Sequence, residues 1–185
     1  MTCKDCKEGF LWDGSSIGKE TTVNGAKTYV TGDSKDAAIL ILTDFFGNEL
    51  PNIRILADHY AKEYPKVGAI GFCYGGWASF KLAADPSLID AVSAAHPSGL
   101  ERSEIDGVKV PVQVLAPEHD HEFSAELKAY TFESLSKTGV PWEYVHFPAM
   151  KHGFASRGNP NDKREKDGFE RAKRSAVQFF NEFLH

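Results

Sequence analysis

Runs of apolar residues alternate with amphipathic segments along most of the chain. Residues 37–44 (AAILILTD) form a continuous apolar run that ends in polar residues, which is typical of a parallel strand covered on both faces. Residues 52–64 (NIRILADHYAKEY) carry apolar side chains at helical spacing, and Pro51 suits the first turn of a helix. The same reading predicts further strands and helices. The strands cover residues 67–72, 90–96, 110–117 and 142–148, and the helices cover 75–84, 124–137 and roughly 165–184.

Strands that alternate with helices indicate a mostly parallel sheet between two helical layers, a three-layer α/β sandwich. Residues 21–32 depart from this pattern and predict an antiparallel hairpin that turns at Asn24-Gly25. The sequence contains no internal repeat, linker or low-complexity tract. A single domain over residues 1–185 is therefore expected.

Composition places the chain among ordinary soluble globular proteins, because 42% of its residues are hydrophobic and 25% are charged. The net charge of -5 and the absence of a basic run interleaved with aromatic residues argue against a general nucleic-acid binder. Residues 162–174 hold the densest charge but mix both signs, as a solvated helix face does. The polar N-terminus and the lack of an apolar run of about 18 residues predict no signal peptide and no membrane span. We expect a cytoplasmic location.

The three cysteines are Cys3, Cys6 and Cys73. Three cysteines cannot form a disulfide framework, so a reducing compartment is the simpler interpretation. Cys3 and Cys6 have C-x-x-C spacing, but no second pair of ligands follows to complete a tetrahedral zinc site. We expect these two to be surface thiols or an incidental disulfide, and no metal site.

Cys73 lies in the stretch AIGFCYGGW (69–77), between a predicted strand and a predicted helix. Gly71 and Gly75 flank it in the pattern G-x-nucleophile-x-G, where the central residue occupies a strained turn and the glycines let strand and helix approach. The sulfur would then lie at a helix N-terminus, where amide N–H groups and the helix dipole favour a thiolate. The alternative is a buried structural cysteine beside a glycine-rich turn.

A nucleophilic cysteine needs a base, and the base needs an acid that orients it. In the α/β-hydrolase order these follow the nucleophile as acid and then histidine, each after a later strand. Asp120 follows the strand predicted at 110–117 and His152 follows the strand at 142–148. Glu118 competes with Asp120 for the acid position. His96 also follows a strand, but it precedes the acid in the chain, which suits a hydrogen-bonded structural histidine.

Four motifs resemble the dienelactone hydrolase family, in particular its fungal branch. They are LTDFFGNE, GFCYGG, APEHD and KHGFASRG, and the N-terminal CKDCKEGFLWDGSSIGKE resembles that branch as well. The resemblance covers nearly the whole chain. It implies a cysteine-dependent α/β-hydrolase acting on lactones or small carboxylic esters, with no metal or organic cofactor. The expected partner is a small-molecule ester or lactone substrate, with no nucleic acid and no membrane, and we expect a monomer or homodimer.

The resemblance also implies roles for individual residues. Cys73 becomes the nucleophile, Asp120 the orienting acid and His152 the base. The backbone amides of Phe45 and Tyr74 become the oxyanion hole.

Four further residues are implied at the substrate. Asp44 stands where bacterial relatives carry a glutamate that contacts the resting thiol, although its side chain is one methylene shorter. Arg157 lies five residues after His152, one position later than the arginine that binds the substrate carboxylate in those relatives. Phe46 and Trp77, next to the catalytic loops, are expected to help wall an aromatic cleft.

The chain departs from the family between residues 64 and 65, where relatives have a further strand and more helix. In the parent fold, helix 52–64 belongs to the crossover that leads to this strand, on the far side of strand 37–44. A right-handed crossover to the opposite neighbour would need the other face of the sheet. Three outcomes are open: a helix on the opposite face, a left-handed connection, or residues missing from the sequence. We favour the last, which a Cα separation well above about 3.8 Å between Tyr64 and Pro65 would indicate.

Two functional hypotheses follow. In the first, Cys73 forms a thioester with the acyl group of a lactone or ester, and His152 directs water to release the acid. In the second, the same fold serves a lyase or cyclase, or binds a ligand without hydrolysis.

Overall fold

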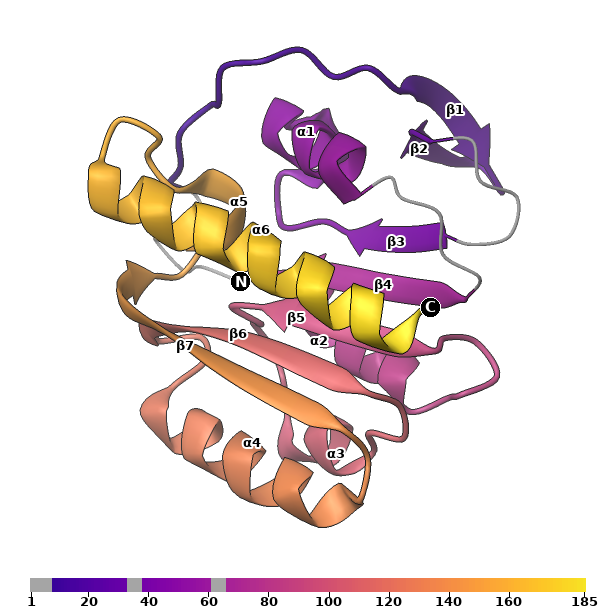
Figure 1. The fold of residues 1–185 in the computed structure, drawn as a ribbon, viewed down its shortest axis with the longest axis vertical. Coiled ribbons are helices and arrows are strands. Elements are labelled where there is room, and N and C mark those ends of the chain that lie inside the picture. Colours follow the sequence, from indigo (N-terminus) through magenta and orange to yellow (C-terminus); the bar gives the residue numbers. More distant parts are fainter. Residues whose placement is uncertain (1–7, 33–37, 61–65) are drawn as a thin grey trace.

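A five-stranded parallel sheet forms the centre of the computed structural model, which describes residues 8–32, 38–60 and 66–185. Its strands follow one another in chain order across the sheet (Figure 1). They are β3 (Ala38–Leu42), β4 (Val67–Phe72), β5 (Ala91–Ala95), β6 (Val112–His119) and β7 (Trp142–Lys151). All four neighbouring pairs are parallel, which confirms the predicted mostly parallel sheet. The carboxyl ends of β4, β6 and β7 carry the residues singled out above.

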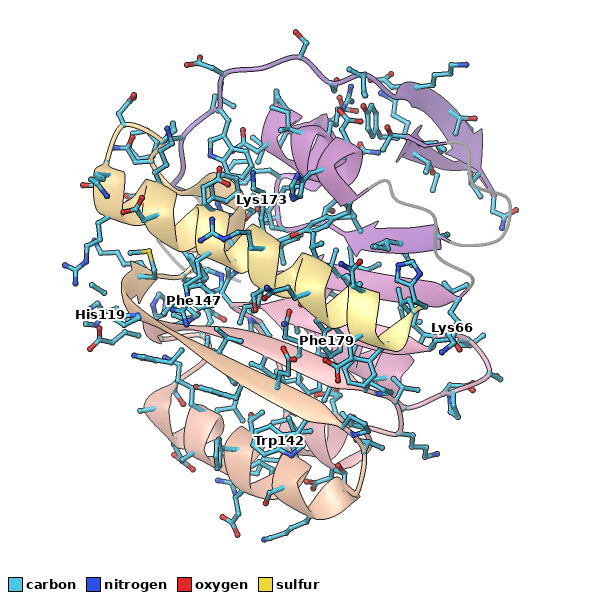
Figure 2. All side chains as sticks on the ribbon, viewed as in Figure 1. Lys66, His119, Trp142, Phe147, Lys173 and Phe179 are labelled. Atoms are coloured by element: carbon cyan, nitrogen blue, oxygen red, sulfur yellow. The ribbon has the colours of Figure 1, made fainter. Side chains whose placement is uncertain are left out.

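Helices cover both faces of the sheet, and each face has its own apolar cluster. They are α1 (Pro51–Tyr60), α2 (Tyr74–Ala83), α3 (Arg102–Asp106), α4 (Ala125–Thr138), α5 (Phe154–Arg157) and α6 (Lys163–Phe183). The first cluster joins α1 and α6 to the sheet, and the second joins α2, α3 and α4 to its other face. Alternate residues of β4 divide between them, with Ile70 in the first and Ala69 in the second. Figure 2 shows Phe147 and Phe179 of the first cluster beside α6, and Trp142 beside α4.

The predicted hairpin is confirmed as a separate two-stranded sheet of β1 (Lys19–Val23) and β2 (Ala26–Val30). Asn24 and Gly25 both have positive φ, 49° and 84°, as a two-residue hairpin turn requires. Short helices were not predicted: α3, α5 and the 3-10 turn η1 (Gly47–Glu49). Each is too short to show a helical period in the sequence.

Helix α1 lies on the face opposite to α2, α3 and α4. Every parallel connection steps to the next strand in the same direction across the sheet, from β3 to β7. Three of these connections place their helix on one face, whereas α1 packs with α6 on the other (Figure 1). The connection from β3 to β4 therefore has the opposite hand to the other three. About 98% of such crossovers are right-handed, so a left-handed one is exceptional.

This placement rules out one of the three outcomes, because α1 has not moved to the opposite face. Helix α1 lies where a helix leading to a strand on the outer side of β3 would be expected. Among the described residues, β3 has no neighbouring strand on that side. A left-handed connection and a sequence that lacks residues both remain compatible with it. The decisive Tyr64–Pro65 separation lies outside the described residues, as do Cys3 and Cys6.

Candidate active site

Cys73 occupies a strained turn between β4 and α2. Its φ of 57° and ψ of -116° are unusual for a residue with a side chain, and the residue is fully buried. A Cβ added to Gly71 would lie 1.9 Å from the carbonyl oxygen of Gly75. A Cβ on Gly75 would lie 2.0 Å from the carbonyl oxygen of Leu42. Only glycine fits either position, so the sequence folds into a sharp elbow that presents Cys73 at the N-terminus of α2.

Asp120 and His152 meet beside this elbow. Because β6 extends to His119 and β7 to Lys151, the two residues directly follow neighbouring parallel strands. His152 Nδ1 lies 2.9 Å from Asp120 Oδ2 and 3.0 Å from Oδ1, and both side chains are buried. Asp120 Oδ1 also accepts hydrogen bonds from the amides of Glu122 and Phe123. The carboxylate is therefore fixed, and it fixes the imidazole ring in turn.

Glu118, the competing acid, points elsewhere. Its carboxylate accepts a hydrogen bond from the Ala149 amide at 2.5 Å, and its side chain is exposed. The structure thus brings Asp120, and not Glu118, to His152.

The charge of His152 follows from its neighbours. Burial alone would lower the pKa of His152, but its interactions with Asp120 and then with Cys73 raise that pKa to about 10. Nε2, the nitrogen on the side of the ring away from Asp120, makes no hydrogen bond of standard geometry with the described residues. Cys73 is nevertheless near enough to this ring to raise its pKa. An imidazolium held beside a thiol favours the thiolate.

The raised pKa predicts a loss of stability at alkaline pH. The ordinary histidine pKa of 6.5 applies to the unfolded chain, so the stabilisation from protonated His152 is complete below pH 6.5 and is lost as pH rises toward about 10. The variant Cys73→Ala removes the overlapping thiol titration and also the contribution of Cys73 to the raised pKa, so we expect its free energy of unfolding to fall as pH rises above 6.5, over a narrower range set by Asp120, in urea denaturation. The fall should be much smaller in Cys73→Ala/Asp120→Asn. Equal slopes in the two variants would contradict the ion pair.

His96 lies against both catalytic candidates. Its Nδ1 accepts a hydrogen bond from the Cys73 amide at 3.2 Å, and its ring meets that of His152 edge to face, with centroids 4.9 Å apart. Burial, followed by the positive charges of His152 and Arg157, holds the pKa of His96 well below its ordinary value. His96 is therefore a neutral, hydrogen-bonded histidine that supports the elbow, as predicted. It does not contact Asp120 in the manner of His152.

The two amides expected to form an oxyanion hole lie at the ends of neighbouring strands. Tyr74 begins α2 directly after Cys73, and Phe45 follows β3, the neighbour of β4. Within the described part of the chain, neither amide donates a hydrogen bond. Two amides without an internal acceptor are able to bind an oxygen anion.

Asp44 and Arg157 form a buried ion pair. Arg157 Nη1 lies 2.7 Å from Asp44 Oδ2, and both side chains are almost completely buried. Ser156 donates a second hydrogen bond to the same oxygen at 3.1 Å, and Asp44 Oδ1 accepts one from the Phe46 amide. The sequence placed both residues near the substrate but did not predict that they pair. Helix α5, which carries Ser156 and Arg157, was not predicted either.

The aromatic residues expected at the cleft differ in their surroundings. Phe45, Phe46 and Tyr74 are exposed, and the Phe46 ring lies 5.3 Å from the Arg157 guanidinium. Trp77 is half-buried, because its indole donates to Glu104 at 3.2 Å and its ring stacks on Tyr74. Trp77 is therefore tied to the α2–α3 packing as well as to Tyr74.

The N-terminal segment braces this site in a way the sequence did not reveal. The buried side-chain amide of Asn52 accepts a hydrogen bond from the backbone amide of Trp12. It also donates to the backbone carbonyl groups of Phe10 and Ser156. Phe10 in turn donates its amide to the Arg157 carbonyl. Residues far apart in sequence thus hold α5 in place.

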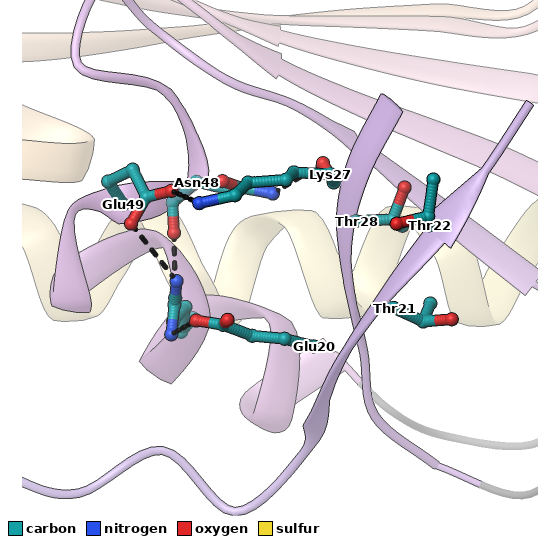
Figure 3. A pocket seen from close by; sticks show the side chains of 8 residues that line it. Glu20, Thr21, Thr22, Lys27, Thr28, Asn48 and Glu49 are labelled. Atoms are coloured by element: carbon teal, nitrogen blue, oxygen red, sulfur yellow. Dashed lines mark hydrogen bonds and ion pairs between the residues drawn. The ribbon is translucent and has the colours of Figure 1, made fainter. Parts of the chain in front are cut away.

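A cavity of about 180 Å³ lies between the hairpin and the start of α1 (Figure 3). Its charged groups are already paired, with Arg54 bound to Glu20 and Glu49, and Lys27 bound to Glu49. None of its lining residues comes from the elbow, from the loop of Asp120 or from the loop of His152. We interpret this cavity as part of the contact between the hairpin and the rest of the protein. The candidate active site is at the elbow.

Residues 57–184 match the Dienelactone hydrolase family over more than half of the chain. The chain belongs to this family. The chain is therefore a hydrolase of the dienelactone hydrolase family. In the described residues no helix is long and apolar enough to cross a membrane, and no three His, Cys, Asp or Glu side chains group as a metal site.

Fungal and animal relatives resemble this member of the dienelactone hydrolase family over almost its full length. Hydrolase tropI of Talaromyces stipitatus is 24% identical, covering 97% of this chain and 95% of that protein. The human carboxymethylenebutenolidase homolog is 21% identical, covering 97% and 96%. The alignment with tropI spans 243 positions, more than the 185 residues of this chain, so that relative contains residues without a counterpart here.

Solved structures of the dienelactone hydrolase family share the fold. A putative dienelactone hydrolase from Klebsiella pneumoniae superposes with a TM-score of 0.64 at 15% identity, covering 90% of this chain and 99% of that chain.

Proposed function

We propose that the chain hydrolyses lactones or small carboxylic esters through a Cys73–His152–Asp120 triad and a thioester intermediate. One observation carries this proposal: the buried 2.9 Å contact between His152 and Asp120 at the ends of β7 and β6, beside a cysteine in a nucleophile elbow. The nucleophile, the base and the orienting acid come from three separate strand ends. The order of these residues in the chain is the order of an α/β-hydrolase triad.

Acylation begins with the Cys73 thiolate, which adds its electron pair to the substrate carbonyl carbon. The carbonyl π electrons move to the oxygen, whose negative charge the amides of Phe45 and Tyr74 stabilise. When this tetrahedral intermediate collapses, the C–O bond to the alcohol breaks and the departing oxygen takes the proton from His152 Nε2. The acyl group is then a thioester of Cys73. In a lactone the departing oxygen stays attached to the acyl group.

Deacylation reverses the role of His152. Its neutral Nε2 takes a proton from water as the water oxygen bonds to the thioester carbonyl carbon. The C–S bond then breaks, which releases the carboxylic acid and restores the thiolate beside the imidazolium. Asp120 accepts a hydrogen bond from the protonated Nδ1 of His152 throughout, so Nε2 remains directed at the reacting atoms.

The Asp44–Arg157 pair is proposed to act on the substrate. An anionic substrate group that binds Arg157 would compete with Asp44 for the guanidinium. Because Asp44 is buried and holds Arg157 at 2.7 Å, this exchange would release the buried carboxylate of Asp44. A substrate without such a group would leave the pair intact.

A chromogenic ester tests the proposal. We expect the protein to hydrolyse p-nitrophenyl acetate with a burst of p-nitrophenol equal to the enzyme concentration, because acyl-Cys73 forms before it is hydrolysed. Iodoacetamide should abolish the reaction in step with alkylation of Cys73, measured by peptide mass spectrometry, and substrate should protect the thiol. Hydrolysis that persists after Cys73 is fully alkylated would contradict the triad. Ligand binding without hydrolysis would favour a non-hydrolytic role for the fold.

A further inference from the structure

The turn after β5, His96–Ser98, encloses the nucleophile. The Cys73 amide donates both to the Ala95 carbonyl at 3.1 Å and to His96 Nδ1 at 3.2 Å. The Ser98 amide donates to the Cys73 carbonyl at 3.0 Å. The end of β5 and the turn that follows it therefore bind both the amide N–H and the carbonyl of the strained Cys73.

The same turn reaches the sulfur itself. Ser98 Oγ lies 3.3 Å from Cys73 Sγ, and both residues are fully buried. The hydroxyl can give its proton to the sulfur or accept one from it, because a thiol and a hydroxyl can each donate. Once Cys73 has lost its proton, Ser98 is the donor in this contact and the sulfur is the acceptor. The contact is then a charge-assisted hydrogen bond, which is stronger than one between neutral groups.

A buried thiolate needs such donors, because removing a charge from water is costly unless it is hydrogen-bonded. In the proposed mechanism His152 gives its Nε2 proton to the departing oxygen, and the amides at the start of α2 bind the substrate oxyanion, so a donor that keeps its proton is also needed. His96 is neutral and its Nδ1 is occupied by the Cys73 amide. Ser98 adds a hydroxyl 3.3 Å from the sulfur, within hydrogen-bond reach of it.

We infer that Ser98 is a further catalytic residue, whose hydroxyl donates a hydrogen bond to the Cys73 thiolate and so increases the fraction of reactive sulfur. This inference rests on the proposed function, in which Cys73 is the nucleophile. The backbone bond from the Ser98 amide to the Cys73 carbonyl fixes the hydroxyl at the correct distance. The chemical step is unchanged: Ser98 keeps its proton while the sulfur forms and breaks its bond to the acyl carbon.

The decisive measurement is the pH dependence of Cys73 alkylation by iodoacetamide, which requires no turnover. Cys3 and Cys6 are first replaced by serine, and modification of Cys73 is followed by mass spectrometry. We expect Ser98→Ala to slow alkylation at pH 7 about tenfold and to move the midpoint of the pH–rate profile upward by about one unit, the effect of losing a hydrogen bond to a charged group. The value of kcat/KM for p-nitrophenyl acetate should fall by a similar factor.

Matched variants separate this effect from structural damage. Ser93→Ala removes another fully buried hydroxyl, which donates to Gln113 from within β5, and should leave the alkylation profile unchanged. Ser98→Thr keeps a hydroxyl and should retain most of the reactivity. Ser98→Gly gives a second variant without a hydroxyl if the alanine variant does not fold, as judged by circular dichroism.

An alkylation profile of Ser98→Ala that equals or exceeds that of the parent would overturn the role of Ser98. Failure of the proposed function would look different. In that case the parent protein would hydrolyse the ester after complete alkylation of Cys73, or would not hydrolyse it at all.

Discussion

Replacing Cys73 with alanine is expected to lower kcat for ester hydrolysis at least about 10³-fold, because no other group can form the acyl-enzyme. The protein should remain folded. Alanine tolerates the elbow backbone about as well as cysteine does, and the loss of one buried sulfur should cost about 1 kcal/mol of stability. Steady-state kinetics with p-nitrophenyl acetate measure the first effect, and urea denaturation measures the second.

Cys3→Ser and Cys6→Ser are the controls for this variant, since both positions lie in the first seven residues, outside the elbow. Each should keep full turnover. If all three variants lost activity equally, the sulfur chemistry would not belong to Cys73. If Cys73→Ala kept its activity while folded, the thioester mechanism would be wrong.

The elbow could be predicted from sequence because its causes are local. Gly71 and Gly75 lie within two residues of Cys73, and the contacts that exclude a Cβ at these positions arise from the turn itself and from the adjoining strand. The alternation of apolar runs and helical segments predicted the mostly parallel sheet in the same way, whereas the order of the strands across it came from the structure. Parallel neighbours in chain order then required the acid and the histidine to meet at one edge of the sheet.

The choice between Asp120 and Glu118 depended on a feature that the sequence defines poorly, the end of a strand. β6 runs to His119, two residues beyond the predicted end. Glu118 therefore lies within the strand, with its side chain exposed at the Ala149 amide. Asp120 lies in the first position beyond it, where the chain turns toward His152.

Buried polar pairs could not be predicted, because they join residues that are distant in sequence. Asp44 and Arg157 are 113 residues apart, and each alone suggested only a substrate contact. Ser98 lies 25 residues from Cys73 and belongs to no motif that the sequence revealed. Such pairs depend on side-chain packing across several elements, whereas periodicity reports only which face of one element is buried.

The face on which α1 lies conflicts with the usual right-handed connection between parallel strands, which the motifs alone do not reveal. The apolar stripe of this helix suits the face that it shares with α6, yet its direct connection from β3 to β4 then has the unusual hand. The alignment with tropI spans 243 positions, more than the length of this chain, so the topological conflict lies in a chain shorter than that relative. The residues from Cys73 to His152 are assembled in a sheet that has no further strand beyond β3 among the described residues.

The second large effect is expected at Asp120. Asp120→Asn should lower kcat for p-nitrophenyl acetate by at least about 100-fold, because an uncharged amide neither stabilises the imidazolium nor holds the tautomer with Nε2 toward the sulfur. Burial then acts on His152 with less opposition, so its pKa should fall toward or below the ordinary 6.5. An imidazole that is neutral at pH 7 would also leave less thiolate, and iodoacetamide should alkylate Cys73 more slowly. Glu118→Gln is the matched control, since this acid lies two residues away, is exposed and directs its carboxylate to the Ala149 amide. It should change kcat less than about twofold. If Glu118→Gln were the inactive variant and Asp120→Asn the active one, the buried contact at 2.9 Å would be a structural ion pair and the acid of the triad would lie elsewhere.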